Sequence, residues 1–204
     1  MPAAPKFRRR SDARPDEILD AALVVFATHG FDAARMEEIA AGAGVSKGAV
    51  YLYFESKEAV LKGLIEREVA PVAARVRALA ENGAGDPAGA LRLIIASASQ
   101  MTQEPGFAAT PRLVLSVAAR FPEIGRYYRE HVVDIGLGAI ETLIAKGAAA
   151  GVFRDVDARA AARMVMGPIL VKALHVHILG GEPDEDAAAR ADAIAGILFR
   201  GIAA

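Results

Sequence analysis

The segment from Met36 to Phe54, MEEIAAGAGVSKGAVYLYF, constrains the fold of this chain more than any other. Apolar or small residues recur along it at the spacing of two short helices that cross steeply. They are Ile39, Ala40, Ala43, Val45, Val50 and Tyr53. Because such helices approach closely, Ala40 has to be small, and Gly44 between them supplies the positive φ that the turn favours. The segment therefore predicts a helix-turn-helix.

The second helix of this unit is expected to present polar and aromatic groups to solvent. Ser46 can cap it by accepting a hydrogen bond from a backbone N–H. Lys47 can donate to guanine O6 and N7 or to a phosphate, and Tyr51, one turn later, can reach a phosphate or a thymine methyl. These features predict that the helix enters the major groove of DNA.

Two other interpretations of the segment are weaker. An ordinary helical hairpin in a core would not expose a lysine and an aromatic group on its second helix. A phosphate-binding loop of the Walker type needs a strand before it and the order Gly-Lys, whereas this chain has Lys47 before Gly48 and no strand-like run upstream.

The rest of the 204 residues predicts an all-α protein, since alanine inflates the apolar fraction and β-branched alternation is nearly absent. We expect about nine helices: the two of the motif, and others near residues 14–29, 56–82, 87–103, 110–120, 123–150, 156–179 and 184–200. The predicted divisions are a disordered basic arm over 1–13, a DNA-binding domain over 14–60, and a ligand-binding and dimerisation domain over 61–204.

Composition narrows the classes of function. The absence of cysteine excludes disulfides, thiolate metal sites and cysteine nucleophiles, and suits a reducing cytoplasm. A net charge of −1 argues against a protein that coats nucleic acid non-specifically. The longest apolar run, 164–171, is too short to span a bilayer, so no membrane partner is expected. The basic N-terminus has no apolar stretch behind it and does not resemble a signal peptide.

Nothing in the sequence predicts catalysis, a metal or a cofactor. There is no nucleophile elbow and no Glu-x-x-His pair. His175 and His177 are two residues apart and point to different sides of a helix, which makes them a poor metal pair. An enzyme built on a helical bundle remains a less favoured alternative.

Residues 18–64 carry a run of short motifs, which are Phe26 with His29-Gly30-Phe31, Ile39-Ala40, Gly44-Val45-Ser46-Lys47-Gly48, Val50-Tyr51, Tyr53-Phe54 and Ser56-Lys57-Glu58. With these motifs the segment resembles the TetR family of bacterial transcriptional regulators. The resemblance implies a homodimer that binds a palindromic DNA operator, usually as a repressor. It also implies a small-molecule effector that binds in the C-terminal domain and releases the DNA.

The chain departs from the family pattern at two places. A Thr or Ser that usually touches a phosphate near the start of the motif is replaced by Arg35-Met36, so Arg35 is expected to take over that contact. Ala49 replaces the commoner Thr. The residues expected at the DNA are Arg35, Ser46, Lys47, Gly48, Ala49, Tyr51, Tyr53 and Lys57.

The C-terminal helices carry two further predictions. A mostly apolar effector site is expected among the middle helices, with the candidates Met101, Phe107, Arg112, Tyr127, His131 and His175. A dimer interface is expected along the last two helices, at Ala161, Val165, Ile169, Ala173, Val176, Ala187, Ala191, Ile194, Leu198 and Ile202. Two alternatives stay open: a DNA-binding protein that has no effector, and a C-terminal helix pair that forms a purely intramolecular core.

Overall fold

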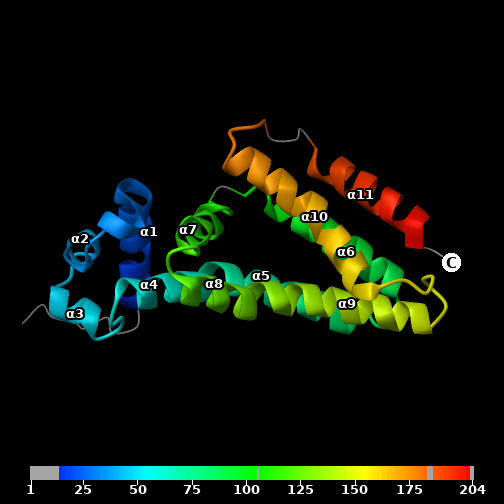
Figure 1. The fold of residues 1–204 in the computed structure, drawn as a ribbon, viewed down its shortest axis with the longest axis horizontal. Coiled ribbons are helices and arrows are strands. Elements are labelled where there is room, and N and C mark those ends of the chain that lie inside the picture. The colour runs from blue at the N-terminus through cyan, green and yellow to red at the C-terminus, as the bar shows by residue number, and fades with distance from the viewer. Residues whose placement is uncertain (1–13, 105, 183–185, 203–204) are drawn as a thin grey trace, which may run out of the picture. The chain divides into compact units, whose positions relative to one another are not determined.

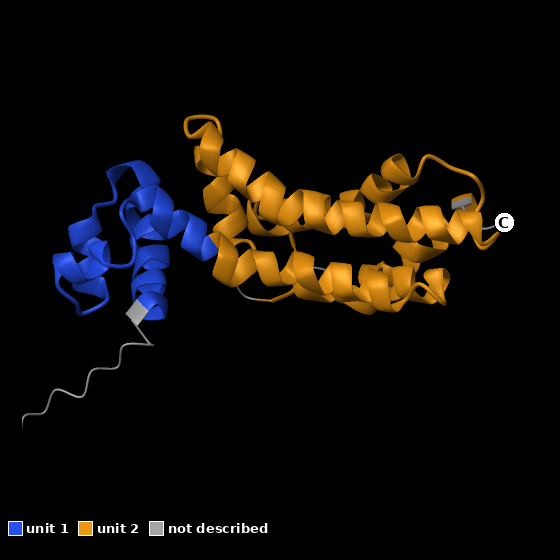
Figure 2. Cartoon of the chain, turned by 90° about the horizontal axis from the view of Figure 1, so that it is seen from below, with its two compact units in different colours: residues 1–64 blue, residues 65–204 orange. Residues whose placement is uncertain are grey.

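The computed structural model describes residues 14–104, 106–182 and 186–202, and within these ranges it is all-α with no β-strand. The chain divides into two compact units, residues 1–64 and 65–204 (Figure 2). The division follows Leu64 rather than residue 60, because Leu61 and Leu64 are fully buried in the first unit, where α4 packs on α1. The predicted N-terminal arm, residues 1–13, lies outside the described residues.

Over its described residues, 14–64, the first unit is a small bundle of four helices. They are α1 (Arg14–Ala33), α2 (Met36–Gly42), α3 (Lys47–Tyr51) and α4 (Lys57–Leu64). Gly30, with φ 76° and ψ 159°, interrupts the helical geometry of α1 at the place where the sequence predicts a stop. The chain then turns back so that the rings of Phe26 and Phe31 meet at 5.2 Å, and both side chains are buried.

The turn between α2 and α3 has the expected chemistry. Gly44 has a φ of 66°, in the left-handed region that glycine adopts without strain. Ser46 is the N-cap of α3, and its hydroxyl accepts a hydrogen bond from the backbone N–H of Ala49 at 3.2 Å. These contacts confirm the predicted roles of Gly44 and Ser46 in the helix-turn-helix.

The second unit contains the remaining helices. They are η1 (Ile65–Val69), α5 (Ala70–Asn82), α6 (Pro87–Met101), α7 (Ala109–Val117), α8 (Pro122–Tyr128), η2 (Arg129–Val133), α9 (Asp134–Ala149), α10 (Ala158–His177) and α11 (Ala187–Ile202). Because η1 joins α4 to α5 and η2 joins α8 to α9 without a loop, the described segments form nine continuous helical runs, as predicted.

The two π-helical turns, η1 and η2, are not foreseen from the sequence. Pro71 explains the first of them. Its ring lacks an N–H and would clash in an α-helix with the carbonyl four residues earlier, which belongs to Arg67 in η1. A wider turn at that place moves the carbonyl away and lets the helix continue.

Helix packing in the second unit follows two lines that are visible in Figure 1. Helix α5 packs along α9 and against α6, α9 packs against α10, and α6 packs along α11. The core between them is aliphatic, with Leu91, Ile94, Ile140, Leu143 and Val165 among its buried members. Nearly all of this unit's buried side chains are apolar; Ser99, Thr102 and Thr110 are the buried polar side chains among the described residues.

Most of the residues predicted for the dimer interface pack inside the chain itself. Six of the residues assigned to it are buried in the chain's own core and present almost no surface to a partner: Ala161, Val165, Ile169, Ala173, Ala191 and Leu198. Val176, Ala187 and Ile194 are half-buried, and the side chain of Ile202 lies outside those described. Helical periodicity identifies an apolar stripe but not the neighbour that covers it, and here α6 and α9 of the same chain cover it.

A glycine pair in α9 tests this packing. A Cβ on Gly147 would overlap the buried ring of Phe153, whereas a Cβ on Gly138 meets nothing within 4 Å. We expect Gly147→Ala to destabilise the protein by about 1–3 kcal/mol through overpacking. Gly138→Ala should be neutral or stabilising by up to about 1 kcal/mol, because alanine favours helix. Thermal melting measures both, and equal melting temperatures for the two variants would contradict the close approach at Gly147.

Candidate nucleic-acid interface and ligand cavity

Helix α3 has one buried anchor and an exposed outer face. Val50 is fully buried, while Tyr51, Leu52 and Tyr53 are 45, 83 and 40% exposed. Ser46, Lys47 and Gly48 are also exposed, and Ala49 is half-buried. The arrangement agrees with the prediction that this face is free to enter a groove. Five residues form the helix itself, so its orientation depends on the burial of Val50 and on the turns that flank it.

Lys47 forms an ion pair with Glu37 of α2, with 2.5 Å between Nζ and Oε1. Both side chains are more than half exposed. The hydrogen bond with Lys47 lowers the pKa of the Glu37 carboxyl, and the same bond raises the pKa of the Lys47 ammonium. Nζ of Lys47 also lies 5.7 Å from the centre of the Tyr51 ring. The sequence reasoning missed Glu37, which places a negative charge beside the cation expected to reach DNA.

Arg35 is the N-cap of α2. Its backbone N–H donates to Oε2 of Glu38 at 2.9 Å, which is one half of a capping box. An arginine side chain has no acceptor, so the half that a Ser or Thr hydroxyl would supply is absent. The residue is exposed at the N-terminus of α2, a position compatible with the phosphate contact expected for it.

Lys57 has a structural role that the sequence did not reveal. Its ammonium donates to the carbonyls of Phe31 and Asp32, at 2.8 and 2.9 Å, and lies 5.0 Å from the centre of the Phe31 ring. These contacts tie the start of α4 to the end of α1. The expected phosphate contact therefore has to be made by an ammonium that already serves two carbonyls.

The second unit contains an apolar cavity of about 410 Å³, open to solvent, between α5, α7, α10 and the η2 region. Its polar lining groups are the guanidinium of Arg112 and the hydroxyl of Tyr128; the other lining residues are aliphatic, Phe107 or glycine. Burial raises the pKa of Tyr128, so this hydroxyl stays neutral at ordinary pH. A cavity of this size and composition suits an organic ligand.

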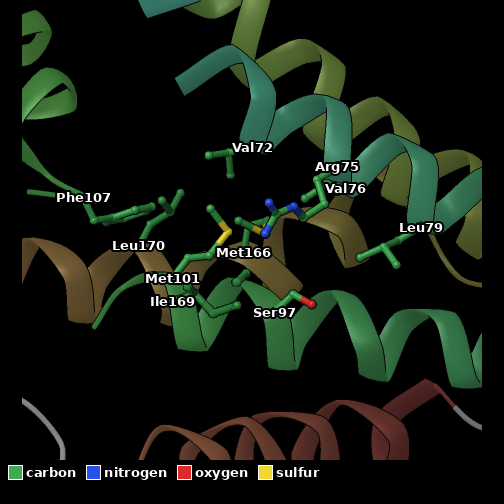
Figure 3. Close-up of a pocket in the computed structure, with 11 residues that line it drawn as sticks. Val72, Arg75, Val76, Leu79, Ser97, Met101, Phe107, Met166, Ile169 and Leu170 are labelled. Atoms are coloured by element: carbon green, nitrogen blue, oxygen red, sulfur yellow. The ribbon is translucent and has the colours of Figure 1, made fainter. Parts of the chain in front are cut away.

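A smaller cavity of about 40 Å³ adjoins the first (Figure 3). The two share Val72, Val76, Phe107, Met166 and Leu170 as lining residues. Arg75, Ser97 and Met101 line only the smaller one.

Half of the candidate ligand residues line these cavities. Met101, Phe107 and Arg112 do, and Tyr127, His131 and His175 do not. The hydroxyl of Tyr127 donates to Oε1 of Glu66 at 2.8 Å, and its ring stacks on that of His131. Burial, with the hydrogen bond to Glu66, raises the pKa of Tyr127 to about 12.

Of the adjacent pair, Tyr128, which was not among the candidates, lines the cavity, and Tyr127 does not. Adjacent residues of a helix point about 100° apart, so only one of the two can face the cavity. The sequence carried no signal that favoured Tyr128.

A polar cluster closes the C-terminal end of α6, next to the cavities. Arg190 of α11 donates to the carbonyl of Ser99 at 2.8 Å and to the hydroxyl of Thr102 at 2.7 Å. Nε2 of His177 lies 2.8 Å from the carbonyl of Thr102 and must carry the proton, because a carbonyl only accepts. The cluster joins the C-terminal ends of α6 and α10 to the first turn of α11.

The described residues hold no group of three or more His, Cys, Asp or Glu side chains that could bind a metal ion. None of the described helices combines the length and the apolar character needed to cross a bilayer.

Comparison with known proteins agrees with this architecture. Residues 18–64 match the family described as bacterial regulatory proteins of the tetR family, and residues 89–198 match the C-terminal domain of AefR-like transcriptional repressors. The regulator YerO of Bacillus subtilis is 36% identical over 74 residues, and RutR of Escherichia coli is 42% identical over 73 residues. These alignments cover 36 and 34% of the chain but only 26 and 34% of the two relatives.

Solved structures share the fold over nearly the whole chain. The fatty acid degradation regulator FadR of Bacillus halodurans aligns with a TM-score of 0.73 at 25% identity, over 95% of this chain and 98% of its own. A TetR transcription regulator of Haloarcula marismortui aligns with a TM-score of 0.76 at 19% identity, over 94 and 98% of the two chains.

The exposed helix-turn-helix and the two family matches identify the class of the protein as DNA-binding transcriptional regulators. With both of its parts matched, the chain belongs to the TetR family of bacterial regulators.

The ion pair between Glu37 and Lys47 yields a test by double substitution. We expect Lys47→Ala to weaken DNA binding and to reduce by about one the slope of log affinity against log salt. Glu37→Gln should strengthen binding a few-fold, because it removes a competitor for Lys47 and a charge that repels phosphate. In the Lys47→Ala background, Glu37→Gln should raise the DNA affinity much less. Binding is measured by fluorescence anisotropy. If Glu37→Gln raises the DNA affinity equally in both backgrounds, the ion pair does not control the contribution of Lys47 to DNA binding.

Lys57 is tested in the same way. If it also contacts a phosphate, Lys57→Ala weakens all DNA sequences alike and lowers the salt slope by about one. Because two backbone carbonyls lose their charged donor, the melting temperature should fall as well. A lower melting temperature with an unchanged affinity across salt would limit Lys57 to its structural role.

Proposed function

We propose that the protein is a repressor that binds a palindromic operator as a homodimer and is released by a small, mostly apolar effector. One observation carries this proposal: the same chain combines an exposed helix-turn-helix face with an apolar cavity of about 410 Å³. The residues at DNA are those assigned from the sequence, with Lys47 and Tyr51 at their centre. A protein that acts on bacterial chromosomal DNA works in the cytoplasm, and we place it there.

The cavity favours an effector over constitutive DNA binding. Unfilled apolar volume costs stability, so a chain without a ligand would be better served by larger side chains at this place. A fold neighbour, FadR of Bacillus subtilis, was solved in complex with stearoyl-CoA; it is 22% identical, with a TM-score of 0.64 over 91 and 98% of the two chains. That complex supports a ligand with a long apolar part. The family's regulators support binding, rather than catalysis, as the activity of this chain.

The dimer interface belongs on the exposed face of the last two helices. Met164 of α10 and Ile197 of α11 are 67 and 69% exposed. Ala189 and Ala193 are also exposed on α11, and small residues let helices of two copies approach closely. Two such helix pairs would form a four-helix bundle about a two-fold axis.

Charge introduced on this face should separate the dimer. We expect Met164→Glu combined with Ile197→Glu to give a monomer by light scattering at micromolar concentration, since two carboxylates would be buried without partners. The control is Val24→Glu, which changes an equally exposed residue of α1 and should leave the dimer intact. A monomeric unsubstituted protein, or a double variant that stays dimeric, would contradict the assignment.

Selection of bound sequences from random duplexes tests the function itself. The expected result is an enriched inverted repeat, whose binding is lost when Lys47 and Tyr51 are both changed to Ala. Apolar compounds that raise the melting temperature should then release the selected DNA. No enrichment would refute the DNA-binding assignment, whereas enrichment without any releasing compound would favour a constitutive DNA-binding protein.

A further inference from the structure

We propose that the effector is an amphipathic molecule with an anionic end, in which Arg75 binds the charge and the 410 Å³ cavity holds the apolar chain. The proposal rests on the proposed effector site and specifies its ligand chemistry.

Arg75 lies at the edge of the smaller cavity, in contact with solvent. It belongs to α5 and is exposed as a residue, yet its side chain lines the smaller cavity. Figure 3 shows its nitrogen atoms turned toward Met166, inside a ring of otherwise mostly apolar side chains. A charged ligand end bound here would keep contact with water, while an attached chain points into the apolar interior.

The charge around the cavities is of one sign. Arg75 and Arg112 are the ionised groups among the lining residues, and no described carboxylate lines either cavity. Arg77, two residues further along α5, pairs with Glu81 at 3.8 Å. Arg75 has no ion pair with any described residue. The missing counter-charge is therefore one that a ligand can supply, and an arginine binds a carboxylate or phosphate through two parallel hydrogen bonds.

The two cavities divide the ligand by size. The smaller cavity, at about 40 Å³, has about a tenth of the larger one's volume and so admits only the small end of a ligand. The larger cavity suits a chain or ring system. Met166 and Leu170 lie on the boundary between the two, and Met101 is beside it. Methionine changes shape easily, so a chain can pass from one cavity to the other with side-chain movement alone.

Simpler ligands fit the observations less well. A small inorganic anion would satisfy Arg75 but leave the large apolar cavity unfilled. A wholly apolar molecule would fill that cavity but bring no partner to the guanidinium. Arg112 is the competing position for the charged end; it lines the larger cavity, on α7, and is exposed.

Matched amphiphiles test the proposal on the full-length protein. The probes are dodecanoate, 1-dodecanol and dodecyltrimethylammonium, each below its micellar concentration, with dissociation constants from calorimetry and melting temperatures as a second readout. We expect dodecanoate to bind about tenfold more tightly than the alcohol, as a charge-assisted hydrogen bond allows. The cation should bind more weakly than the alcohol. Equal affinity for acid and alcohol would overturn the anionic end.

Substitution then locates the charge. Arg75→Met should abolish the preference for dodecanoate and leave the affinity for the alcohol unchanged, while Arg75→Lys should keep part of the preference. The matched control, Arg112→Met, should keep all of it. Loss of the preference in Arg112→Met but not in Arg75→Met would place the charged end at Arg112 and overturn the assignment. Melting of each variant without ligand verifies its fold.

A further binding measurement distinguishes a carboxylate from a phosphate as the charged group that Arg75 binds. The coenzyme A thioester of dodecanoate carries phosphates in place of the free carboxylate. If the thioester binds more tightly and loses affinity in Arg75→Met, Arg75 binds a phosphate; if only the free acid does so, it binds a carboxylate. Operator binding is measured alongside: a protein that binds DNA but none of the amphiphiles refutes this inference alone, and one that binds amphiphiles but no DNA refutes the regulator.

Discussion

Burial of Val50 is the constraint on which the first unit depends. A five-residue helix has too few internal hydrogen bonds to persist in water, so α3 exists because its inner side is packed and its ends are held. Gly44 allows the chain to reverse before it, and Ser46 satisfies a backbone donor at its start. With the inner side fixed, Lys47 and Tyr51 have only the outer side to occupy. The face proposed to bind DNA is thus the consequence of a packing contact on the opposite side of the helix.

The helices of the second unit pack closely in some places and leave a cavity in another. Its helices pair closely along α5 and α9 and along α6 and α11, where buried aliphatic side chains interdigitate. Between α5, α7 and α10 they do not close, and the cavity remains. The hydrogen bond from Thr110 of α7 to Glu68 of η1, at 2.8 Å, and that from Tyr127 to Glu66 tie the cavity's walls to the π turn that begins this unit.

Local chemistry made much of this structure predictable. The helix-turn-helix, its glycine turn and its serine cap follow from residues within one short segment. Each break between helices likewise follows from the few residues at that break. The two π-helical turns were not predicted from the sequence, although Pro71 was a signal for η1. Three of the six candidate ligand residues line a cavity and three do not, because an apolar helix face with a nearby polar group looks the same in the sequence whether it borders a cavity or a neighbouring helix. Arg75 went unnoticed for that reason, as did the pairing of Lys47 with Glu37.

The amino-acid sequence by itself determined the all-α class, the nine helical runs and the identity of the side chains that face outward on α3. Those features depend on interactions between residues close in the chain, whose spacing can be read directly. Tertiary structure alone decided that Ala161, Val165 and Leu198 fill the chain's own core, that Tyr128 rather than Tyr127 faces the cavity, and that Lys57 holds α1. Each of these features depends on which distant segment packs against a given face of a helix, and helical periodicity does not identify that segment.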